Sequence, residues 1–300
     1  MTPMPDQSPS QSPSPSPSPS PSQSPVPGPR PGSPGPAGSR SAVVTGSGKG
    51  IGRAVAERLT ADGWLVVGLE RSPGSGSVED GAVAQVVLGD ASAREAHQRA
   101  AEAAMALAPL AGWVNNAGIT KRTPLHELDE DVVREILGIN GFGYVWGCSA
   151  AVTAFLDQGV AGAIVNVGSI HGRASHPDHA AYEFTKGGID ALTRSVAVTY
   201  GGLGIRANVV APGGVRTPHL EAQIAASPDP VAAERALAEG PPMGRIARAE
   251  EVAALTAFLL SDAAPYVTGQ SIAVDGGWTS SFGDVSPDPA LLARFNAPPR

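Results

Sequence analysis

From residue 41 onward, short apolar runs alternate along the chain with longer segments whose apolar residues recur every three or four positions. The short runs are almost continuously apolar, which is typical of strands buried on both faces of a parallel sheet. The longer segments have the spacing of one helix face, as Ile51, Val55 and Leu59 illustrate. The expected strands are 41–45, 64–70, 82–88, 111–115, 163–167, 205–210 and 271–274, and the expected long helices are 93–107, 130–158, 180–201 and 249–261.

This alternation predicts the fold class. Strands joined through helices imply right-handed crossovers and a parallel sheet covered on both sides. We therefore expect an α/β fold, a single Rossmann-type doubly wound domain with a seven-stranded parallel sheet and helices on both faces. Such sheets bind ligands beyond the carboxyl ends of their strands, so candidate chemistry is sought in the loops that follow each strand.

The chain divides into three parts. Residues 1–39 are mostly Ser-Pro repeats, which bury too little apolar surface to offset the entropy of ordering them. We expect a disordered tail with polyproline II character, serving as a solvated appendage, a ligand for a proline-binding groove or a phosphorylation target. Residues 40–280 form the folded domain, and residues 281–300 are a polar C-terminal extension.

Charge and composition narrow the partners. The net charge of −7 disfavours a nucleic-acid partner, because phosphate binding needs a basic face. No uninterrupted apolar run reaches the roughly 18 residues of a membrane span, and no signal-peptide core follows the start. Cys148 is the only cysteine, so neither a disulfide framework nor a cysteine metal cluster is expected. These features predict a cytoplasmic protein with no membrane partner.

The loop after the first strand suits a phosphate group. It reads Thr-Gly-Ser-Gly-Lys-Gly-Ile-Gly over 45–52, and glycine allows close backbone approach to a ligand. The helix that follows directs its free N–H groups and positive dipole end at the loop. A glycine-rich turn without a ligand is the alternative, which the flanking strand and amphipathic helix disfavour. The candidate cofactor residues here are Gly46, Ser47, Lys49, Gly50, Ile51 and Gly52.

A second chemical group lies on the expected helix 180–201. Tyr182 and Lys186 are four residues apart, so their side chains share one helix face. A tyrosine with an ordinary pKa near 10 becomes an acid or base near neutrality if the pKa falls by about 2–3 units, and a nearby ammonium acts in that direction. The alternative is a partly buried tyrosine beside a surface lysine.

Together these motifs resemble those of the classical short-chain dehydrogenase/reductase family. The resemblance covers about residues 40–278 and includes T-G-x-x-x-G-I-G at 45–52, N-N-A-G at 115–118 and Y-x-x-x-K at 182–186. It implies an NAD(P)-dependent oxidoreductase that transfers a hydride between the nicotinamide and a small secondary alcohol or ketone. The catalytic residues implied by the resemblance are Asn140, Ser169, Tyr182 and Lys186.

The resemblance also implies a role for each member of this tetrad. Tyr182 would exchange a proton with the substrate, and Ser169, thirteen residues ahead of it, would hydrogen-bond the substrate oxygen. Lys186 would lower the pKa of Tyr182 and bind the nicotinamide ribose. Asn140, expected within a helix, would bond to backbone and hold a water that links Lys186 to solvent.

The end of the second strand bears on the choice of nicotinamide. The carboxylate of Glu70 can accept both ribose hydroxyls of NAD and would repel the 2′-phosphate of NADP. Lys49 and Arg71 could instead pair with that phosphate. We expect NAD(H), with NADP(H) as the alternative. By resemblance, Asp90, followed by Ala91, holds the adenine amino group.

Further segments complete the expected cofactor cleft, all by resemblance. Asn116, Ala117 and Gly118 follow the fourth strand and line the cleft. The P-G-x-V-x-T segment follows the sixth strand, where the backbone of Val215 would grip the carboxamide. Its expected cofactor residues are Pro212, Gly213, Val215 and Thr217. The resemblance further implies a homo-oligomer, a tetramer or dimer.

The substrate side is expected between a lid and a histidine-rich loop. Residues 218–245 resemble a mobile lid. Three histidines lie between Ser169 and Tyr182, where they could contact a polar or acidic substrate. A metal site is disfavoured because Asp178 is the only acid in this loop and no cysteine is near. The candidate substrate residues are Ser169, His171, His176 and His219.

Three rival functions remain at this stage. The closest is an NADPH-dependent reductase of 3-oxoacyl-type ketones, which Lys49 and Arg71 keep open. A second is a catalytically silent, cofactor-binding regulatory protein, but no tetrad position is replaced. A third is an interaction protein recruited through the Ser-Pro tail. The pattern leaves the substrate open, because a fold specifies chemistry only through the site built on it.

Overall fold

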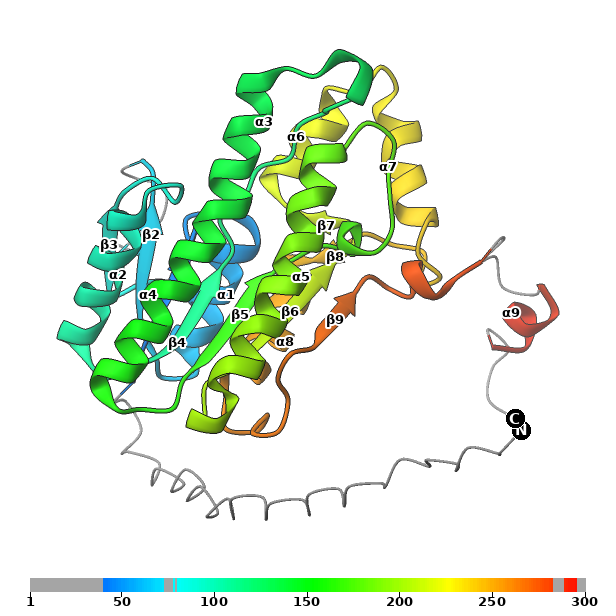
Figure 1. The fold of residues 1–300 in the computed structure, drawn as a ribbon. Coiled ribbons are helices and arrows are strands. Elements are labelled where there is room, and N and C mark those ends of the chain that lie inside the picture. Colours follow the sequence, from blue (N-terminus) through cyan, green and yellow to red (C-terminus); the bar gives the residue numbers. More distant parts are fainter. Residues whose placement is uncertain (1–39, 73–77, 79, 283–288, 296–300) are drawn as a thin grey trace, which may run out of the picture.

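The computed structural model describes residues 40–72, 78, 80–282 and 289–295, so the predicted tail and most of the C-terminal extension lie outside the described residues. A single parallel sheet runs through the middle of the described part, with helices on both sides (Figure 1). Its order is β3-β2-β1-β4-β5-β6-β9, and all its paired strands are parallel. The strands are β1 (Ser41–Thr45), β2 (Leu65–Glu70), β3 (Gln85–Leu88), β4 (Leu110–Asn115), β5 (Ala163–Val167), β6 (Arg206–Pro212) and β9 (Ser271–Val274). The expected seven-stranded, doubly wound fold is confirmed.

The long helices cover the two faces of the sheet. On one face α1 packs against α8, and on the other α2, α4 and α5 lie side by side. The strand order reverses between β1 and β4, so the carboxyl ends of these two strands border the switch-point crevice of a doubly wound sheet. The helices are α1 (Gly50–Ala61), α2 (Arg94–Leu107), α3 (Glu130–Ile136), α4 (Gly143–Gln158), α5 (Ala180–Tyr200), α6 (Pro218–Ala225), α7 (Pro230–Glu239), α8 (Ala249–Leu260) and α9 (Pro289–Phe295).

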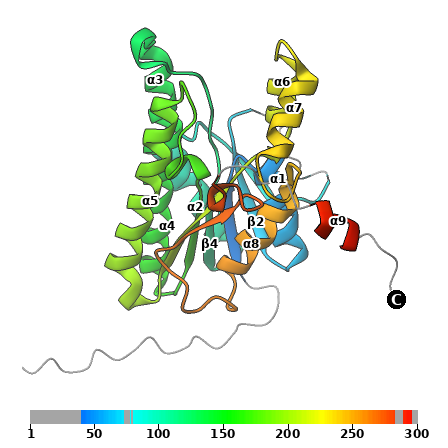
Figure 2. The same cartoon turned by 90° about the vertical axis from the view of Figure 1, so that its right-hand side faces the viewer.

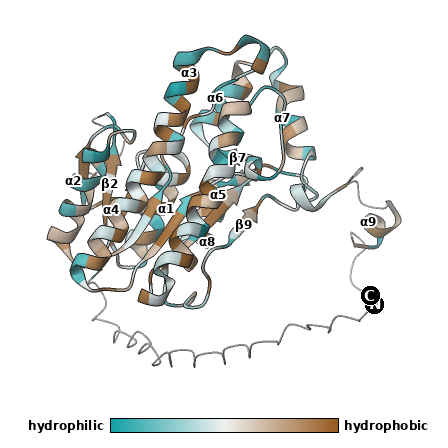
Figure 3. Cartoon of the chain, in the orientation of Figure 1, coloured by the Kyte–Doolittle hydropathy of each residue, from teal (hydrophilic) through white to brown (hydrophobic). Residues whose placement is uncertain are grey.

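The core explains why the strands read as continuous apolar runs. Ala42 and Val44 of β1 face the cluster under α1 and α8, whereas Val43 faces the cluster under α2 and α4. Successive side chains of a strand point to opposite faces, so a strand covered on both sides needs apolar residues at every position. The strands accordingly form a hydrophobic centre, and the more hydrophilic segments lie in the outer helices and loops (Figure 3).

A buried polar network ties the central strands to the helices behind them. Asn115 of β4 accepts a hydrogen bond from Trp113 Nε1 (2.7 Å) and donates to Asn166 Oδ1 of β5 (2.8 Å). Asn166 in turn donates to Thr193 Oγ1 of α5 (2.8 Å). Cys148 of α4 lies against both amides, and burial raises the pKa of its thiol to about 12. The network fixes β4, β5, α4 and α5 relative to one another.

Three regions differ from the sequence expectations. The third strand begins at Gln85 rather than at residue 82. Two helices, α6 and α7, occupy residues 218–245, the expected lid, because Pro218 and Pro230 each begin a helix instead of breaking it. A short parallel pair of strands, β7 (Val215–Arg216) and β8 (Ala247–Arg248), joins the two ends of the expected lid segment. The short turns are 3-10 helices at Leu125–Glu127, Ile170–Gly172, Gly201–Leu203 and Trp278–Ser280.

The expected helix 130–158 is continuous but not uniform. Between α3 and α4, residues Leu137–Phe142 form a π-helical turn. Among the described residues, Glu130–Gln158 is the one helical segment long and apolar enough to cross a membrane by length and composition. That composition also suits a helix packed inside a protein, and 61% of its most apolar window is buried here.

The buried ring of His97 links stability to pH. It stacks on Trp113 with 6.0 Å between ring centroids, its Nε2 donates to Ala91 O (2.7 Å), and its Nδ1 is buried without a partner. Burial lowers the pKa of His97 below its ordinary value near 6.5. As pH falls through 6.5, His97 becomes protonated in the unfolded chain but stays neutral in the folded chain. The free energy of unfolding therefore decreases.

We therefore predict that replacing His97 with Phe flattens the acid side of the stability profile. The wild-type unfolding free energy should fall below pH 6.5 by up to about 1.4 kcal/mol per pH unit more than that of His97→Phe. Urea unfolding followed by circular dichroism between pH 5 and 8, at fixed protein concentration, measures the difference. His126→Phe, at an exposed histidine, is the matched control. Equal pH slopes for His97→Phe and the wild type would contradict the prediction.

Candidate active site

The glycine-rich loop and the segment after β4 are bound to each other. Thr45 Oγ1 accepts hydrogen bonds from the backbone N–H groups of Asn116 and Ala117, both at 2.9 Å. Asn116 Nδ2 donates to the carbonyl oxygens of Thr45 (3.0 Å) and Gly46 (3.1 Å). The two motifs that the sequence placed at separate strand ends therefore form one unit at the switch point.

The loop itself fits a bound phosphate. Gly46 and Gly50 have φ values of +68° and +57°, which other residues rarely adopt. Lys49 stands at the N-cap of α1 without a side-chain cap, and the first turn of α1 holds no acidic residue. The free N–H groups of that turn therefore face the loop with the positive end of the helix dipole. These residues suit the pyrophosphate of a dinucleotide.

Glu70 reaches into this loop from the end of β2. Its Oε1 accepts hydrogen bonds from Ser47 Oγ (3.0 Å) and from the backbone N–H of Gly48 (2.7 Å). Lys49, which follows Gly48, and Arg71, which follows Glu70, are both exposed. The carboxylate of Glu70 is therefore bound to the glycine-rich loop, and a basic residue stands next in sequence to each end of this contact.

The predicted adenine contact, Asp90, lies in a tight turn after β3. Its Oδ1 accepts hydrogen bonds from Ser92 N (2.8 Å) and Ser92 Oγ (2.7 Å). These bonds, with a smaller contribution from the charge of Arg71, hold the pKa of Asp90 below its usual value. His97 fixes the carbonyl of Ala91, so the whole turn is anchored to the core.

Asn140 lies in the π-helical turn and is fully buried. Its Oδ1 accepts from the backbone N–H of Ile119 (2.9 Å), and its Nδ2 donates to the carbonyl of Ile119 (2.8 Å). The predicted backbone bonding is therefore present, but the site is a π turn and not a regular helix. π turns often occur at functional sites, and the sequence pattern gave no signal for this one.

Lys186 is buried at the centre of the site. Its Nζ donates to the carbonyl of Val167 at the end of β5 (3.0 Å) and lies 5.4 Å from the ring centroid of Tyr182. Burial lowers the pKa of Lys186 to about 7. Tyr144, which sequence reasoning missed, donates to the same carbonyl (2.8 Å) and packs 5.3 Å from the ammonium. Its place one turn after Asn140 on the same helix was the available signal.

The pKa of Tyr182 differs from the sequence expectation. In the protein by itself, burial raises the pKa of this phenol, and hydrogen bonds with Ser169 and Thr120 act in the opposite sense. The expected lowering by Lys186 is absent because the same burial disfavours the ammonium. Thr120 is a further contact of Tyr182 that the motif analysis did not single out.

Thr123 joins the segment after β4 to the start of α5. It is 2% exposed, its backbone N–H donates to the carbonyl of Asp178 (2.6 Å), and its Oγ1 accepts from the backbone N–H of Ala181 (3.1 Å). Ala181 immediately precedes Tyr182, so this contact sets where the helix that carries the phenol begins. Sequence reasoning missed Thr123 because it stands in an irregular segment with no motif.

The histidines predicted near the substrate fall into two groups. His171 and His176 come together with His179 beside Tyr182, with His171 5.6 Å from the tyrosine ring. His219 lies on α6 instead, where burial and the charge of Lys49 lower its pKa. Among the described residues, no group of three or more histidine, cysteine, aspartate or glutamate side chains is arranged to hold a metal ion.

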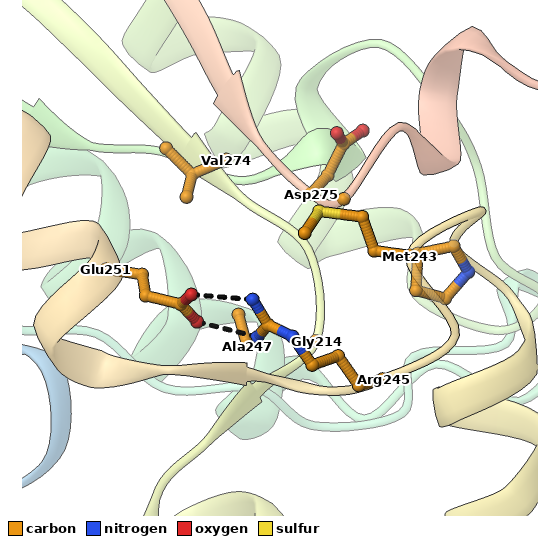
Figure 4. A pocket seen from close by; sticks show the side chains of 9 residues that line it. Gly214, Met243, Arg245, Ala247, Glu251, Val274 and Asp275 are labelled. Atoms are coloured by element: carbon orange, nitrogen blue, oxygen red, sulfur yellow. Dashed lines mark hydrogen bonds and ion pairs between the residues drawn. The ribbon is translucent and has the colours of Figure 1, made fainter. Parts of the chain in front are cut away.

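The lid is tied to the domain at both ends. Thr217 caps α6 by accepting from Leu220 N (3.2 Å), and its methyl group would lie 3.1 Å from a Cβ at Gly50 in the phosphate loop. At the other end, Arg245 pairs with both oxygens of Glu251 at 2.7 and 2.8 Å (Figure 4). This pair borders a cavity of about 100 Å³ that also touches Gly214, Met243 and Asp275. Pro212 ends β6, Gly213 follows it and Val215 begins β7, so all three directly precede the Thr217 anchor.

Known proteins resemble this chain over nearly its whole folded part. A family model described as enoyl-(acyl carrier protein) reductase matches residues 46–279. The 3beta-hydroxysteroid dehydrogenase 1 of Eggerthella lenta is 38% identical over 248 residues, 80% of this chain and 94% of that protein. Galactitol 2-dehydrogenase (L-tagatose-forming) of Cereibacter sphaeroides is 38% identical over 244 residues, 79% and 94% of the two chains. A structure assigned as an NAD(P)-dependent gluconate 5-dehydrogenase from Beutenbergia cavernae, with NADP bound at low occupancy, has a TM-score of 0.74 and 35% identity, covering 81% of this chain and 97% of that one.

We predict that Thr123→Val lowers kcat about tenfold, worth about 1.4 kcal/mol in the barrier. Valine keeps the volume but leaves Ala181 N–H without its acceptor, so the start of α5 and the phenol of Tyr182 shift. Thr123→Ser keeps the hydroxyl and should retain most of the wild-type kcat. Steady-state kinetics should find the KM for the nicotinamide unchanged in both variants. Equal losses in the two variants would contradict the prediction, because Thr123→Ser keeps the hydrogen bond that Thr123→Val removes.

We also predict that Lys186→Met changes the pH dependence of stability and lowers turnover. The folded chain releases the lysine proton near pH 7 and the unfolded chain near pH 10.4, so wild-type stability rises with pH between these values. Relative to Lys186→Met, the cofactor-free wild type should gain up to about 1.4 kcal/mol per pH unit between pH 7 and 9. Chemical unfolding at each pH measures this difference in stability. The turnover of Lys186→Met should be at least about 100-fold below that of the wild type. Parallel pH profiles would show that Lys186 keeps an ordinary pKa.

Proposed function

This chain belongs to the short-chain dehydrogenase/reductase family, and we propose that Asn140, Ser169, Tyr182 and Lys186 are its catalytic residues. The protein is an oxidoreductase that transfers a hydride between NAD(P) and the carbon of a secondary alcohol or ketone. The observation that carries the residue assignment is the burial of Lys186 beside the Tyr182 ring, at the strand end where Ser169 bonds Tyr182.

In this proposal Tyr182 moves the proton. During oxidation its phenolate takes the hydroxyl proton of the alcohol, and during reduction the phenol returns a proton to the carbonyl oxygen. Ser169 shares a hydrogen bond with Tyr182, so a substrate oxygen held between the two hydroxyls is oriented for this transfer. When bound, the nicotinamide accepts or supplies the hydride, and its oxidised form adds a positive charge that favours phenolate.

Lys186 and Asn140 support this step in different ways. Lys186 has one N–H on Val167 O, which leaves two donors of the ammonium for the ribose hydroxyls and for a proton path. Asn140 uses both ends of its amide on Ile119, which directly precedes Thr120 in the segment after β4. Its role in the proposal is to hold the segment that contacts Tyr182, together with any water that this π turn orients.

We propose NAD(H) as the preferred cofactor. The loop residues Gly46, Ser47, Lys49, Gly50, Ile51 and Gly52 would hold its pyrophosphate, and Asp90 and Ala91 its adenine. The supporting observation is Glu70, whose negative charge lies against the loop through Ser47 and Gly48. Exposed Lys49 and Arg71, and the NADP bound to a similar protein, support NADPH-dependent ketone reduction as the second candidate. Asn116, Ala117, Gly118, Pro212, Gly213, Val215 and Thr217 would line the rest of the cofactor cleft.

We further propose a cytoplasmic homo-oligomer, a tetramer or dimer. The supporting feature is the set of apolar side chains left exposed on the outer sides of neighbouring helices. These are Phe142 beside α4, Val145 and Leu156 on α4, and Phe184 and Val198 on α5. Large apolar side chains exposed together on neighbouring helices favour a protein contact there. The single buried Cys148 suits a reducing compartment.

The cofactor proposal is tested by titrating the protein with NADH and NADPH and following nicotinamide fluorescence. We expect NADH to bind at least about tenfold tighter, a difference of about 1.4 kcal/mol. Glu70→Gln retains an oxygen for Ser47 and Gly48 but removes the charge, so it should reduce this preference about tenfold. Arg71→Ala is the matched control and should leave NADH binding unchanged. Tighter NADPH in the wild type, reversed by Lys49→Ala or Arg71→Ala, would establish the second candidate.

A further inference from the structure

Three imidazoles form a triangle between the β5–α5 loop and the first turn of α5. The ring centroids of His171 and His176 are 6.1 Å apart, those of His171 and His179 are 6.1 Å apart, and those of His176 and His179 are 5.1 Å apart. The ring of His171 meets the edge of Tyr182 at 5.6 Å. We call these three residues the histidine triangle. Its place next to the ring of Tyr182 makes it a polar surface within reach of groups attached to the reacting carbon.

The hydrogen bonds of the triangle fix which nitrogen of each ring carries the proton. Nδ1 of His176 (3.2 Å) and Nδ1 of His179 (2.7 Å) both face the carbonyl of Pro177, which can only accept. Nδ1 of His171 faces a carboxylate oxygen of Glu183 (3.2 Å). Each neutral ring therefore donates through Nδ1 and presents the lone pair of Nε2. None of the described residues forms a hydrogen bond with any of these three Nε2 atoms.

The loop is held in place, so the triangle is preformed. Asp178 is the one described residue other than glycine with a positive φ (64°), and its carbonyl accepts from Thr123 N. Its carboxylate pairs with Arg122 at 2.5 Å. Glu183 also accepts from the backbone N–H of His176 (2.6 Å). Beneath these contacts lies a surface cavity of about 240 Å³ that His176, His179 and Glu183 line with Thr123.

Burial and the carboxylate of Glu183 act on His171 in opposite senses. Burial lowers the pKa of His171 below its ordinary value, whereas the hydrogen bond with Glu183 and the charge of that carboxylate oppose the lowering. Burial opposes ionisation of Glu183, but hydrogen bonds from the His176 backbone, His171 and Ser175 hold its pKa below the usual value. The surrounding carboxylates, Glu183 and Asp178, are thus anionic and already paired. This surface accepts hydrogen bonds more readily than it attracts an anion.

We propose that the histidine triangle binds hydroxyl groups of a polyhydroxylated substrate, a polyol or sugar, next to the carbon that is oxidised at Tyr182. Hydroxyl groups donate to the Nε2 atoms, and the rings, held through Nδ1, need no rearrangement to receive them. The inference rests on the proposed function, because it assumes that the reacting carbon lies at Tyr182. It adds the chemical class of the substrate, which the family does not specify.

The test measures the oxidation of three classes of six-carbon probe by the full-length protein with its preferred nicotinamide. The classes are hexitols (galactitol, sorbitol and mannitol), a simple alcohol (2-hexanol) and a hydroxy acid (5-hydroxyhexanoate). The expected result is a kcat/KM for the best hexitol at least tenfold above that for 2-hexanol. Calorimetric titration of the same hexitols into protein saturated with NADH measures binding without turnover. Hexitol binding without hydride transfer would reject the proposed function, and with it the place of the hydroxyls beside a reacting carbon, but would keep the triangle as a hydroxyl-binding site.

Two substitutions at the same positions isolate the Nε2 atoms. Asparagine places its amide near Nδ1 and lacks a group at Nε2, whereas glutamine reaches the Nε2 position. The double variant His176→Asn/His179→Asn should lower the ratio of hexitol to 2-hexanol kcat/KM at least tenfold. The double variant His176→Gln/His179→Gln should retain most of the ratio, and His126→Asn, outside the triangle, should not change it.

Three outcomes would overturn the inference. If 2-hexanol is oxidised as efficiently as every hexitol, the triangle is not a hydroxyl site although the enzyme is active. If 5-hydroxyhexanoate is preferred, and its kcat/KM rises as the pH falls toward 6, protonated rings bind a carboxylate instead. A hexitol preference that the Asn and Gln variants lose equally would place the hydroxyl recognition elsewhere.

Discussion

The hydrogen bonds made by residues 115–123, directly after β4, connect the separate parts of the site. Asn115 enters the buried amide network, and Asn116 holds the phosphate loop through Thr45 and Gly46. Ile119 occupies both ends of the Asn140 amide. Thr120 bonds Tyr182, and Thr123 holds the start of α5. One stretch of backbone therefore positions the glycine-rich loop, the π turn and the start of α5. This stretch cannot move without disturbing all three.

The site is costly to fold because its chemistry needs buried ionisable groups. The pKa of Lys186 is lowered and that of Tyr182 is raised, so burial works against the charged form of each side chain. The hydrogen bonds that offset this cost come from the ends of β4 and β5, including the carbonyl of Val167, which accepts from both Lys186 and Tyr144. A rigid parallel sheet can hold such groups in place, as a flexible loop cannot.

The two sides of the cleft are built differently. On the cofactor side, backbone N–H groups, glycines and the carboxylate of Glu70 form a surface shaped for a dinucleotide. On the other side, the histidine triangle lies beside Tyr182 at the start of α5. Helices α6 and α7 rise above the sheet opposite α3 and α5 (Figure 2). The lid is anchored through Thr217 near the phosphate loop and through Arg245 with Glu251. One end of the expected lid is therefore in contact with the loop that is proposed to bind the cofactor.

The sequence by itself determined the parallel α/β fold and the approximate place of each sheet strand, because burial on both faces imposes a pattern that is local and regular. It also identified the motif residues, since glycine at the loop and the Tyr-Lys spacing depend on short-range geometry. Only the tertiary structure decided the π turn at Asn140, the contacts of Tyr144, Thr120 and Thr123, the second lid helix and the separation of His219 from the other histidines. It also showed that burial raises the pKa of Tyr182 in the protein by itself. These features depend on residues distant in sequence and on burial, which arise when the strands pack and which no local pattern encodes.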